Sequence, residues 1–299
     1  MSKENRALKI AYLGLGIMGS AMTINLGKSG YAVVGWNRSM DRGGVYDVRL
    51  QDIKVVPDIA DAVKDADVIF SCLGDVPDVK EVLLGPVKQH AKENAIVVDT
   101  TTIGRAAAIE LKEKLAESGI RFLDAPVTGG DVGAKQGTLT ILVGGARADF
   151  DEVLPILNNI GRNIVYCGES GSGQAMKLCN QVLCAINMIA VSETFALADE
   201  MGIDKKLILD SLGSGAGASW ALSNLGARIA KGDFAPGFTL EHMLKDLRLI
   251  DENADDCQLP GVELAREYFN KAGKLGGAEG FRQGTQAMYR AYAATKSAT

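Results

Sequence analysis

The stretch Leu8–Gly19, LKIAYLGLGIMG, decides the fold of this 299-residue chain. It joins an apolar run ending at Leu13 directly to Gly14-Leu15-Gly16-Ile17-Met18-Gly19, a GxGxxG pattern. Gly14 permits the tight turn, Gly16 lets a pyrophosphate approach the backbone, and Gly19 lets the next helix pack against the strand. The helix expected over Ile17–Ser29 directs its N-terminal amides at the phosphates. A purely structural glycine turn is the alternative, but the strand before it and the helix after it favour a dinucleotide site.

Apolar runs and amphipathic stretches alternate through the first half of the chain. Strands are expected over Leu8–Leu13, Tyr31–Trp36, Asp67–Leu73, Ala95–Asp99, Ile120–Leu123, Thr138–Val143 and Asn163–Tyr166. Helices are expected over Asp78–Ala91 and Gly104–Ser118. Strand and helix in alternation predict a parallel sheet covered on both faces, as in a Rossmann dinucleotide-binding domain.

After Gly173 the pattern changes to helices alone. Gln174–Met201 is a long helical run that is apolar nearly all round, so we expect it to be buried. Further helices are expected over Lys205–Leu212, Trp220–Lys231, Leu240–Asp255, Gly261–Ala272 and Gly280–Ala293. The fold class is therefore α/β with a second, all-α domain. Residues 1–170 form the Rossmann domain, and residues 171–299 form a helical substrate and oligomerisation domain that begins with a long interdomain helix.

The bulk composition is that of an ordinary globular protein, with 47 % hydrophobic and 23 % charged residues. The net charge is −5 with acids and bases interleaved, so a nucleic acid partner is not expected. The first nine residues, MSKENRALK, lack the apolar core of a signal peptide. The longest apolar run, Val182–Val191, is interrupted by Asn187 and is too short to span a membrane. We therefore expect a cytoplasmic protein.

Cysteine and histidine usage argues against a metal site. The five cysteines are scattered without a CxxC, and there are two histidines. His90 is interpreted as solvated. His242, one helical turn before Lys245, could approach the site, but a structural role is favoured. Cys72 and Cys179 are interpreted as small core side chains rather than redox switches.

The residues at the end of the second strand indicate which nicotinamide cofactor the chain prefers. An NAD enzyme usually carries Asp or Glu there for the ribose hydroxyls, whereas this chain has Asn37-Arg38-Ser39. With no carboxylate to repel a 2′-phosphate, Arg38 can fork onto that phosphate and Ser39 can donate to it. The sequence predicts a preference for NADP(H), with NAD possible. Alternatively, Arg38 is a solvated loop residue.

A glycine turn, Thr128-Gly129-Gly130, follows a strand end and Pro126. Consecutive exposed amides in such a turn form a cup for a carboxylate, and the Thr128 hydroxyl adds a donor. The substrate predicted from this turn is a small carboxylic acid. A glycine-rich hairpin loop with no ligand is the alternative.

Lys177 is the one charged residue between Gln174 and Glu193. In an apolar helix near the domain boundary, burial would lower its pKa and prepare it for proton transfer. Asn180 and Gln181 lie at i+3 and i+4, on the same face. A lysine with adjacent amides could hold a substrate oxygen and move its proton. The alternative is a lysine that snorkels to solvent.

Four motifs, in order and nearly end to end, resemble the β-hydroxyacid dehydrogenases. They are GLGIMG at Gly14–Gly19, DAPVTGG at Asp124–Gly130, GxGxxxK at Gly171–Lys177 and KDL at Lys245–Leu247. This family contains 3-hydroxyisobutyrate dehydrogenase, tartronate semialdehyde reductase and glyoxylate/succinic semialdehyde reductase. The resemblance implies a helical domain like the C-terminal domain of 6-phosphogluconate dehydrogenase, an NAD(P) cofactor, interconversion of a small β- or γ-hydroxy acid with its semialdehyde or keto form, and a homodimer or homotetramer.

The resemblance also implies roles for individual residues. Lys177 would be catalytic, with Thr128–Gly130 as the carboxylate anchor. Asn180, Gln181, Phe238 and Asp246 would lie beside the substrate. The cofactor would be touched by Lys245 and, at its nicotinamide half, by Leu73, Gly74 and Thr102.

Two positions depart from the family pattern and leave the substrate open. The turn usually carries Ser where this chain has Thr128, and many members have Asn where it has Gln181. Two other functions remain open: an imine reductase on the same fold, against which Lys177 argues, and a non-catalytic dinucleotide-binding module.

Overall fold

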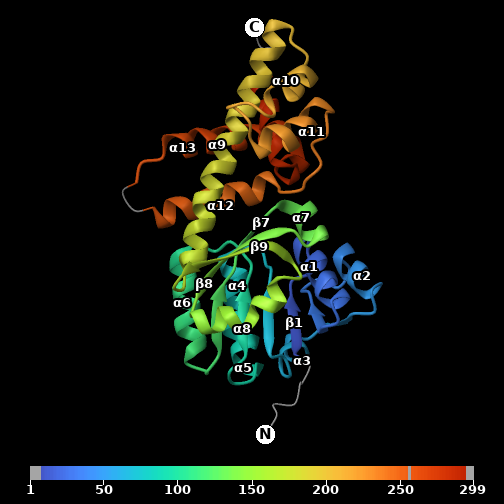
Figure 1. Cartoon of the computed structure of the whole chain (residues 1–299), viewed down its shortest axis with the longest axis vertical. Coiled ribbons are helices and arrows are strands. Elements are labelled where there is room, and N and C mark those ends of the chain that lie inside the picture. Colours follow the sequence, from blue (N-terminus) through green and yellow to red (C-terminus); the bar gives the residue numbers. More distant parts are fainter. Residues whose placement is uncertain (1–7, 255–256, 294–299) are drawn as a thin grey trace. The chain divides into compact units, whose positions relative to one another are not determined.

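A computed structural model describes residues 8–254 and 257–293. The chain divides into two compact units, Met1–Lys177 and Leu178–Thr299, which we call the sheet unit and the helical unit (Figure 1). The division lies within helix α9 (Ser172–Met201), which begins in the sheet unit and continues into the helical unit, whereas the boundary predicted from the sequence is residue 170.

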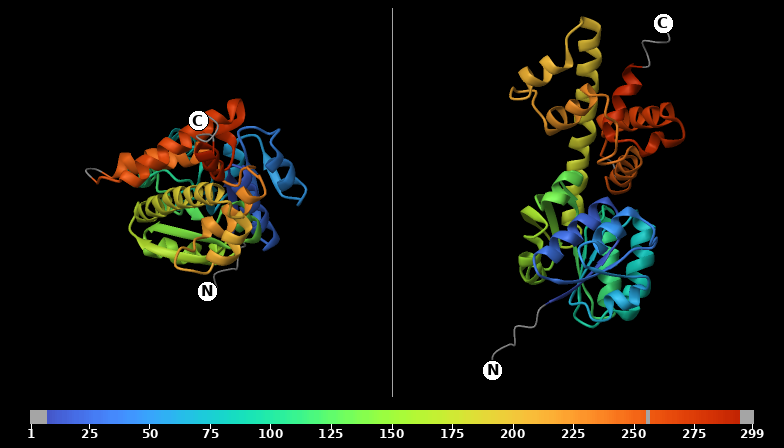
Figure 2. Two further views of the ribbon diagram at one scale, coloured as in Figure 1. Left: turned by 90° about the horizontal axis from the view of Figure 1, so that it is seen from above. Right: turned by 90° about the vertical axis from the view of Figure 1, so that its right-hand side faces the viewer.

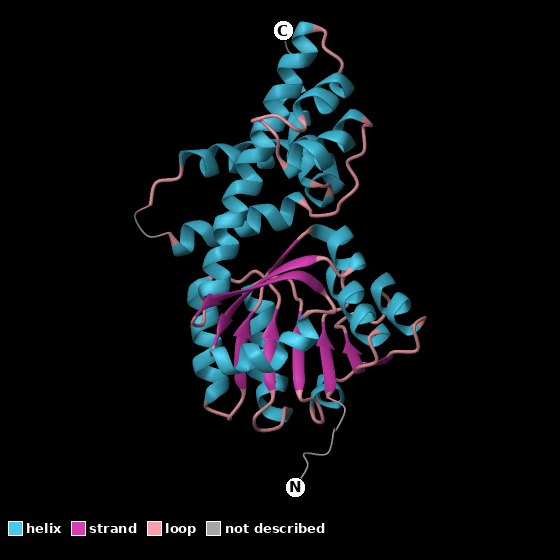
Figure 3. Ribbon diagram, viewed as in Figure 1, coloured by secondary structure: helices cyan, strands magenta, loops and turns pink. Residues whose placement is uncertain are grey.

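The sheet unit contains a nine-stranded sheet with the order β3-β2-β1-β4-β5-β6-β8-β7, and β9 also pairs with β8 (Figure 3). Its strands are β1 (Lys9–Leu13), β2 (Ala32–Trp36), β3 (Lys54–Val56), β4 (Val68–Ser71), β5 (Ile96–Asp99), β6 (Arg121–Asp124), β7 (Val127–Thr128), β8 (Leu139–Gly145) and β9 (Gly161–Gly168). The first six strands are parallel, as predicted, whereas β8 runs antiparallel to β6 and β7. β3 and β7 were not expected, because two or three residues are too few to show a period.

Helices cover both faces of this sheet, as predicted (Figure 2). They are α1 (Ile17–Lys28), α2 (Gly43–Arg49), α3 (Ile59–Val63), α4 (Val76–Val82), a π-helical turn (Leu83–Val87), α5 (Lys88–His90), α6 (Arg105–Ala116), α7 (Gly130–Gln136) and α8 (Arg147–Leu157). Alternate residues of β1 serve opposite faces. Ile10 and Tyr12 join the core with α1, α2, α7 and α8, while Ala11 and Leu13 join the core with α3, α4 and α6.

The described part of the helical unit is built from helices. After α9 come α10 (Lys205–Leu212), a π-helical turn (Ala221–Gly226), α11 (Ala227–Ala230), α12 (Leu240–Asn253), α13 (Pro260–Leu275), two 3₁₀ turns (Gly277–Arg282 and Thr285–Met288) and α14 (Tyr289–Ala293). The expected end of one helix, Asp255, lies outside the described residues. The expected single helix from Gly280 to Ala293 is wrong. Gly280 packs so closely on α13 that a Cβ atom would lie 1.9 Å from the Gly273 carbonyl oxygen, and the chain turns tightly there.

Burial of the whole of α9 was also expected, and this is wrong. Leu183, Leu197 and Met201 are more than half exposed, at 65 %, 56 % and 65 %. An apolar composition on every side of a helix therefore does not mean that this chain alone covers it.

By length and composition α9 could also cross a membrane, and it is the one such helix in the described ranges. Yet buried polar side chains run along it, including Gln174, Lys177, Gln181 and Ser192. Their positions are those of a helix in the core of a folded protein, and we interpret α9 in that way.

Candidate active site

In the glycine turn after β1, two glycines leave no room for a side chain, whereas the third faces open space. A Cβ atom on Gly14, where φ is +97°, would lie 2.2 Å from the Cys72 carbonyl oxygen. A Cβ atom on Gly19 would lie 1.9 Å from the Gly14 carbonyl oxygen. Gly16, at the start of α1, is exposed, and a Cβ atom there would have no neighbour within 4 Å. The backbone of this turn is thus open to a ligand at Gly16, and it fits the pyrophosphate of a dinucleotide.

Asn37 connects this turn to the end of β2. Its Oδ1 accepts a hydrogen bond from the Leu15 N–H at 2.9 Å, and its Nδ2 donates to the Ser39 carbonyl oxygen at 2.7 Å. Leu15 is buried, whereas Ile17 is 55 % exposed and Met18 is partly buried. The side chain of Asn37 therefore has an internal role that the sequence did not indicate.

Arg38 lies at the surface beside an acid from another element. Its side chain is 73 % exposed, and Nη1 lies 2.9 Å from Oδ1 of Asp78 on α4. The other carboxylate oxygen of Asp78 accepts a hydrogen bond from the Asp75 N–H and helps to cap α4. The expectation that no carboxylate faces Arg38 is therefore wrong. Asp78 is 40 residues away in the chain, too far for inspection of the strand end to find it.

The residues expected beside the nicotinamide, Leu73, Gly74 and Thr102, follow β4 and β5. Thr101 links these two strand ends: its Oγ1 accepts from the Leu73 N–H at 2.9 Å and donates to Asp99 Oδ1 at 2.7 Å. The Ser71 hydroxyl also donates to Asp99 Oδ1. Complete burial raises the pKa of Asp99 to about 6. Among the described residues, Oδ2 of Asp99 has no hydrogen-bond partner.

The Thr128 turn joins strand to helix. Thr128 ends β7, where it pairs with Thr140 of β8, and the chain then enters α7. Gly129 and Gly130 have φ values of +129° and +66°, which glycine adopts without strain. Gly129 is exposed, so its backbone can be approached from solvent.

Lys177 is 6 % exposed, on the second turn of α9. The first turn of that helix is held by Asp124, at the end of β6. The Asp124 carboxylate accepts hydrogen bonds from Gly171 N–H at 2.7 Å and Gln174 N–H at 2.9 Å. Burial raises the pKa of Asp124, and these backbone bonds oppose the rise. Sequence reasoning missed the parts played by Asp124 and Gln174, although both stand inside the motifs that it singled out.

Four of the expected site residues come together within the helical unit. The Asn180 side-chain amide donates to Gln181 Oε1 at 2.8 Å. Gln181 in turn donates to Asp246 Oδ2 at 2.6 Å. Lys245 Nζ lies 2.8 Å from Asp246 Oδ1, and the Asp246 side chain is 1 % exposed. This cluster joins α9 to α12 and presents amide, carboxylate and ammonium groups together.

Phe238 and His242 lie together at the start of α12. Their rings stack with centroids 5.8 Å apart, and Phe238 is 37 % exposed. His242 Nδ1 lies 2.8 Å from the hydroxyl of Thr239, which caps the helix. These contacts are consistent with a structural role for His242.

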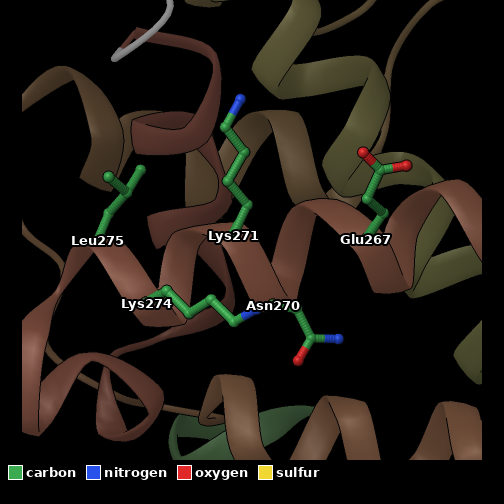
Figure 4. Close-up of a pocket in the computed structure, with 5 residues that line it drawn as sticks. All are labelled: Glu267, Asn270, Lys271, Lys274 and Leu275. Carbon is green, nitrogen blue, oxygen red and sulfur yellow. The ribbon is translucent and has the colours of Figure 1, made fainter.

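One further surface feature contains none of the expected site residues. A surface hollow on α13 is lined by Glu267, Asn270, Lys271, Lys274 and Leu275 (Figure 4). Within the described ranges, no group of three His, Cys, Asp or Glu residues could hold a metal ion, and no disulfide joins the cysteines. The chemistry-bearing residues are therefore those of the glycine turn, the strand-end loops, the start of α9 and the α9–α12 cluster.

The fold and these residues define a class. A parallel sheet that opens with a GxGxxG turn, whose central glycine is exposed, is the frame of a nicotinamide-dependent oxidoreductase. Residues 9–168 match the family described as the NAD binding domain of 6-phosphogluconate dehydrogenase. Residues 171–292 match the family described as NAD-binding of NADP-dependent 3-hydroxyisobutyrate dehydrogenase.

The chain belongs to the β-hydroxyacid dehydrogenase family. It is 52 % identical over 286 residues to an uncharacterised oxidoreductase of Synechocystis, covering 95 % of this chain and 98 % of the relative. It is 35 % identical to the 2-hydroxy-3-oxopropionate reductase of Escherichia coli, covering 91 % and 94 %. The structure of a Mycobacterium tuberculosis 3-hydroxyisobutyrate dehydrogenase with L-serine aligns with a TM-score of 0.84 at 29 % identity, covering 95 % and 98 %. The chain is thus an NAD(P)-dependent enzyme of the hydroxyacid dehydrogenase and semialdehyde reductase class.

Proposed function

We propose that this enzyme uses NADPH to reduce a small aldehyde or ketone that bears a carboxylate, and that it oxidises the corresponding β- or γ-hydroxy acid in reverse. Lys177 is the proton donor in reduction and the proton acceptor in oxidation. The observation that carries the proposal is a lysine 6 % exposed, on a helix whose first turn is anchored to the strand ends of the nucleotide-binding sheet.

Each group of residues has a task in this reaction. The amides around Gly16 hold the pyrophosphate, and the strand-end loops with Leu73 and Thr102 hold the nicotinamide half. Bound NADPH supplies the hydride. Lys177 gives its proton to the carbonyl oxygen as negative charge develops there, and Asn180 orients that oxygen.

The Thr128–Gly130 turn anchors the substrate carboxylate in this proposal. Left-handed φ values at Gly129 and Gly130 turn successive peptide groups toward one side, and Gly129 is exposed. L-Serine, named with the Mycobacterium tuberculosis relative, is itself a hydroxy compound with a carboxylate. The 2-hydroxy-3-oxopropionate of the Escherichia coli relative is an aldehyde with a carboxylate.

The preference for NADPH rests on Arg38 and is modulated by Asp78. A guanidinium can bind the 2′-phosphate with two parallel hydrogen bonds. Since Asp78 already pairs with Arg38 at 2.9 Å, the phosphate must compete with that carboxylate. We therefore expect a preference for NADPH that is moderate and that responds to the charge on Asp78.

We also propose a cytoplasmic homodimer or homotetramer. Leu197, Met201, Leu207 and Trp220 of the helical unit are each more than half exposed, and a second copy would cover such side chains. The cysteines form no disulfide in the described part of the chain, which fits a reducing compartment. Light scattering on the purified protein tests the assembly, and a monomer at micromolar concentration would contradict it.

A substrate panel tests the function. NADPH consumption would be followed with glyoxylate, succinic semialdehyde, tartronate semialdehyde and methylmalonate semialdehyde, beside a cyclic imine. We expect at least one semialdehyde to be reduced and the imine to be left unchanged. Turnover of the imine alone would support an imine reductase, and no turnover with any compound would support a non-catalytic module.

A further inference from the structure

The first turn of α9 is tied to the strand ends of the sheet unit by a side chain that the proposed reaction does not use. We infer that Gln174 is a positioning residue, which fixes the first turn of α9, and with it Lys177, against the loop Thr101–Gly104 that follows β5. This inference rests on the proposed role of Lys177 in proton transfer.

Both ends of the Gln174 side-chain amide are bonded to that loop. Oε1 accepts hydrogen bonds from the Ile103 N–H at 2.9 Å and the Gly104 N–H at 3.1 Å. Nε2 donates to the Thr101 carbonyl oxygen at 2.7 Å. Gln174 is completely buried, so water cannot replace any of these bonds if they break. One amide therefore determines the path of four consecutive residues.

The backbone of Gln174 is held equally firmly. Its N–H donates to the Asp124 carboxylate, which also accepts from the Gly171 N–H. Gly173 lies so close to β8 that a Cβ atom there would be 2.3 Å from the Leu142 carbonyl oxygen. The first turn of α9 consequently cannot slide along the sheet without breaking buried hydrogen bonds or clashing with β8.

The loop and the helix turn each carry part of the proposed reaction. Thr102 lies within the loop, and Thr101 bonds the Leu73 N–H, so both expected nicotinamide segments are attached to it. Lys177 follows Gln174 by three residues and lies on the same face of α9. Gln174 thus fixes Lys177, which moves the proton, relative to the loops after β4 and β5. These loops hold the nicotinamide ring that gives or receives the hydride. A misplacement of about 1 Å in such an arrangement costs on the order of 10²-fold in rate.

The first test removes the amide while keeping the length of the side chain. Gln174→Met should lower kcat by about 10- to 100-fold. The Kd of NADPH and the KM of the carboxylate substrate should stay within about threefold of the parent, because Gln174 touches neither ligand. Val153→Ala, on the buried face of α8, is the matched control: it lowers stability without touching this loop and should keep the kcat of the parent.

The second test asks whether the hydrogen bonds themselves carry the effect. In Gln174→Glu, a protonated carboxyl can accept and donate where the amide did, whereas an ionised one cannot donate to Thr101. Burial and the carboxylates of Asp124 and Asp99, on the neighbouring strands, raise the pKa of the new group. The ammonium of Lys177, one turn further along the same face of α9, and Arg105, the residue after Gly104, oppose this rise. The kcat of the variant relative to the parent should therefore rise as the pH falls from about 8 to about 6.

These outcomes separate this inference from the proposed function. If Gln174→Met keeps kcat within about twofold while Lys177→Ala is inactive, Gln174 is merely structural and the proposed function stands. If the kcat of Gln174→Glu relative to the parent did not change with pH, the hydrogen bonds of Gln174 would not be what positions Lys177, and the proposed function would again stand. An active Lys177→Ala enzyme would instead overturn the proposed function.

Discussion

The start of α9 in the sheet unit and the cluster of expected site residues in the helical unit are held in different ways. At the start of α9, buried side chains bond to backbone: Asp124 to Gly171 and Gln174, and Gln174 to the loop after β5. In the helical unit, the cluster of expected site residues bonds side chain to side chain, from Asn180 through Gln181 to Asp246.

The two kinds of bonding suit different tasks. Side chains that bond to backbone determine the course of loops, so the sheet unit presents a preformed frame for the cofactor and for Lys177. Side chains that bond to one another, as Gln181 does to Asn180 and Asp246, can exchange partners when a ligand arrives. We therefore propose that the sheet unit fixes the geometry of the proton-transfer group and that the α9–α12 cluster adapts to the substrate.

The largest loss of activity is expected on substitution of Lys177, near the start of α9. Lys177→Ala should cut kcat by roughly 10²–10⁴-fold, the usual contribution of a positioned acid–base group. Lys177→Arg should not restore activity, because a guanidinium does not release its proton near neutral pH. Steady-state NADPH oxidation measures both variants.

His242 supplies the control for this prediction. His242→Ala should be mild by comparison, since the ring is stacked on Phe238 and bonded to the cap residue Thr239. NADPH titration shows whether each variant still binds cofactor. If His242→Ala were inactive and Lys177→Ala active, the proton donor would be His242 of the helical unit and not Lys177.

The second effect concerns stability in the sheet unit. The pKa of Asp99 is raised from 3.8 to about 6, so the folded chain keeps this proton over a pH range in which the unfolded chain releases it. The stabilising contribution is therefore present below the unfolded pKa and is lost as the pH rises through about 6. Relative to Asp99→Asn, the free energy of unfolding of the parent should fall by about 2–3 kcal/mol between about pH 4 and pH 7. Denaturant titrations check this, and a pH-independent difference would mean that Asp99 is ionised in the fold.

A third effect tests the carboxylate anchor. A methyl ester of the best semialdehyde should show kcat/KM lowered by about 10- to 100-fold, because donors at the Thr128 turn lose a charged acceptor. A matched ketone or aldehyde of equal length without the acid gives the same comparison. Equal turnover of ester and free acid would mean that the Thr128 turn does not bind the substrate carboxylate.

The smallest effect is expected at the Arg38–Asp78 pair. Arg38→Asp should weaken NADPH binding by about 10-fold and NADH binding little, since the 2′-phosphate loses its cation. Asp78→Asn should strengthen NADPH binding by about threefold, because Arg38 no longer shares its charge while an amide oxygen remains to cap α4. Fluorescence titration with both cofactors measures these changes. Equal affinity of the parent for NADPH and NADH would contradict the preference.

The comparison also explains what could be predicted from the sequence. The Gly14–Gly19 turn could be predicted because Gly14 and Gly19 meet local backbone constraints and Gly16 leaves room for a phosphate. The alternation of strands and helices could be predicted because buried parallel strands are apolar throughout. The Arg38–Asp78 and Gln174–Thr101 contacts span 40 and 73 residues, and no local pattern indicates them. Exposure of Leu183 and Leu197 was missed because apolar composition does not reveal which side chains of a helix the rest of the chain covers.

We propose that this chain transfers hydride from NADPH to a carboxylate-bearing aldehyde with Lys177 as the proton donor. The most direct test mixes the purified parent enzyme with NADPH and each semialdehyde of the panel, with Lys177→Ala run beside it, and follows NADPH oxidation together with formation of the hydroxy acid. The account predicts equimolar NADPH loss and hydroxy acid formation with the parent, and a rate lowered by at least about 10²-fold in the variant. Equal rates in parent and variant, or NADPH loss without hydroxy acid formation, would contradict it.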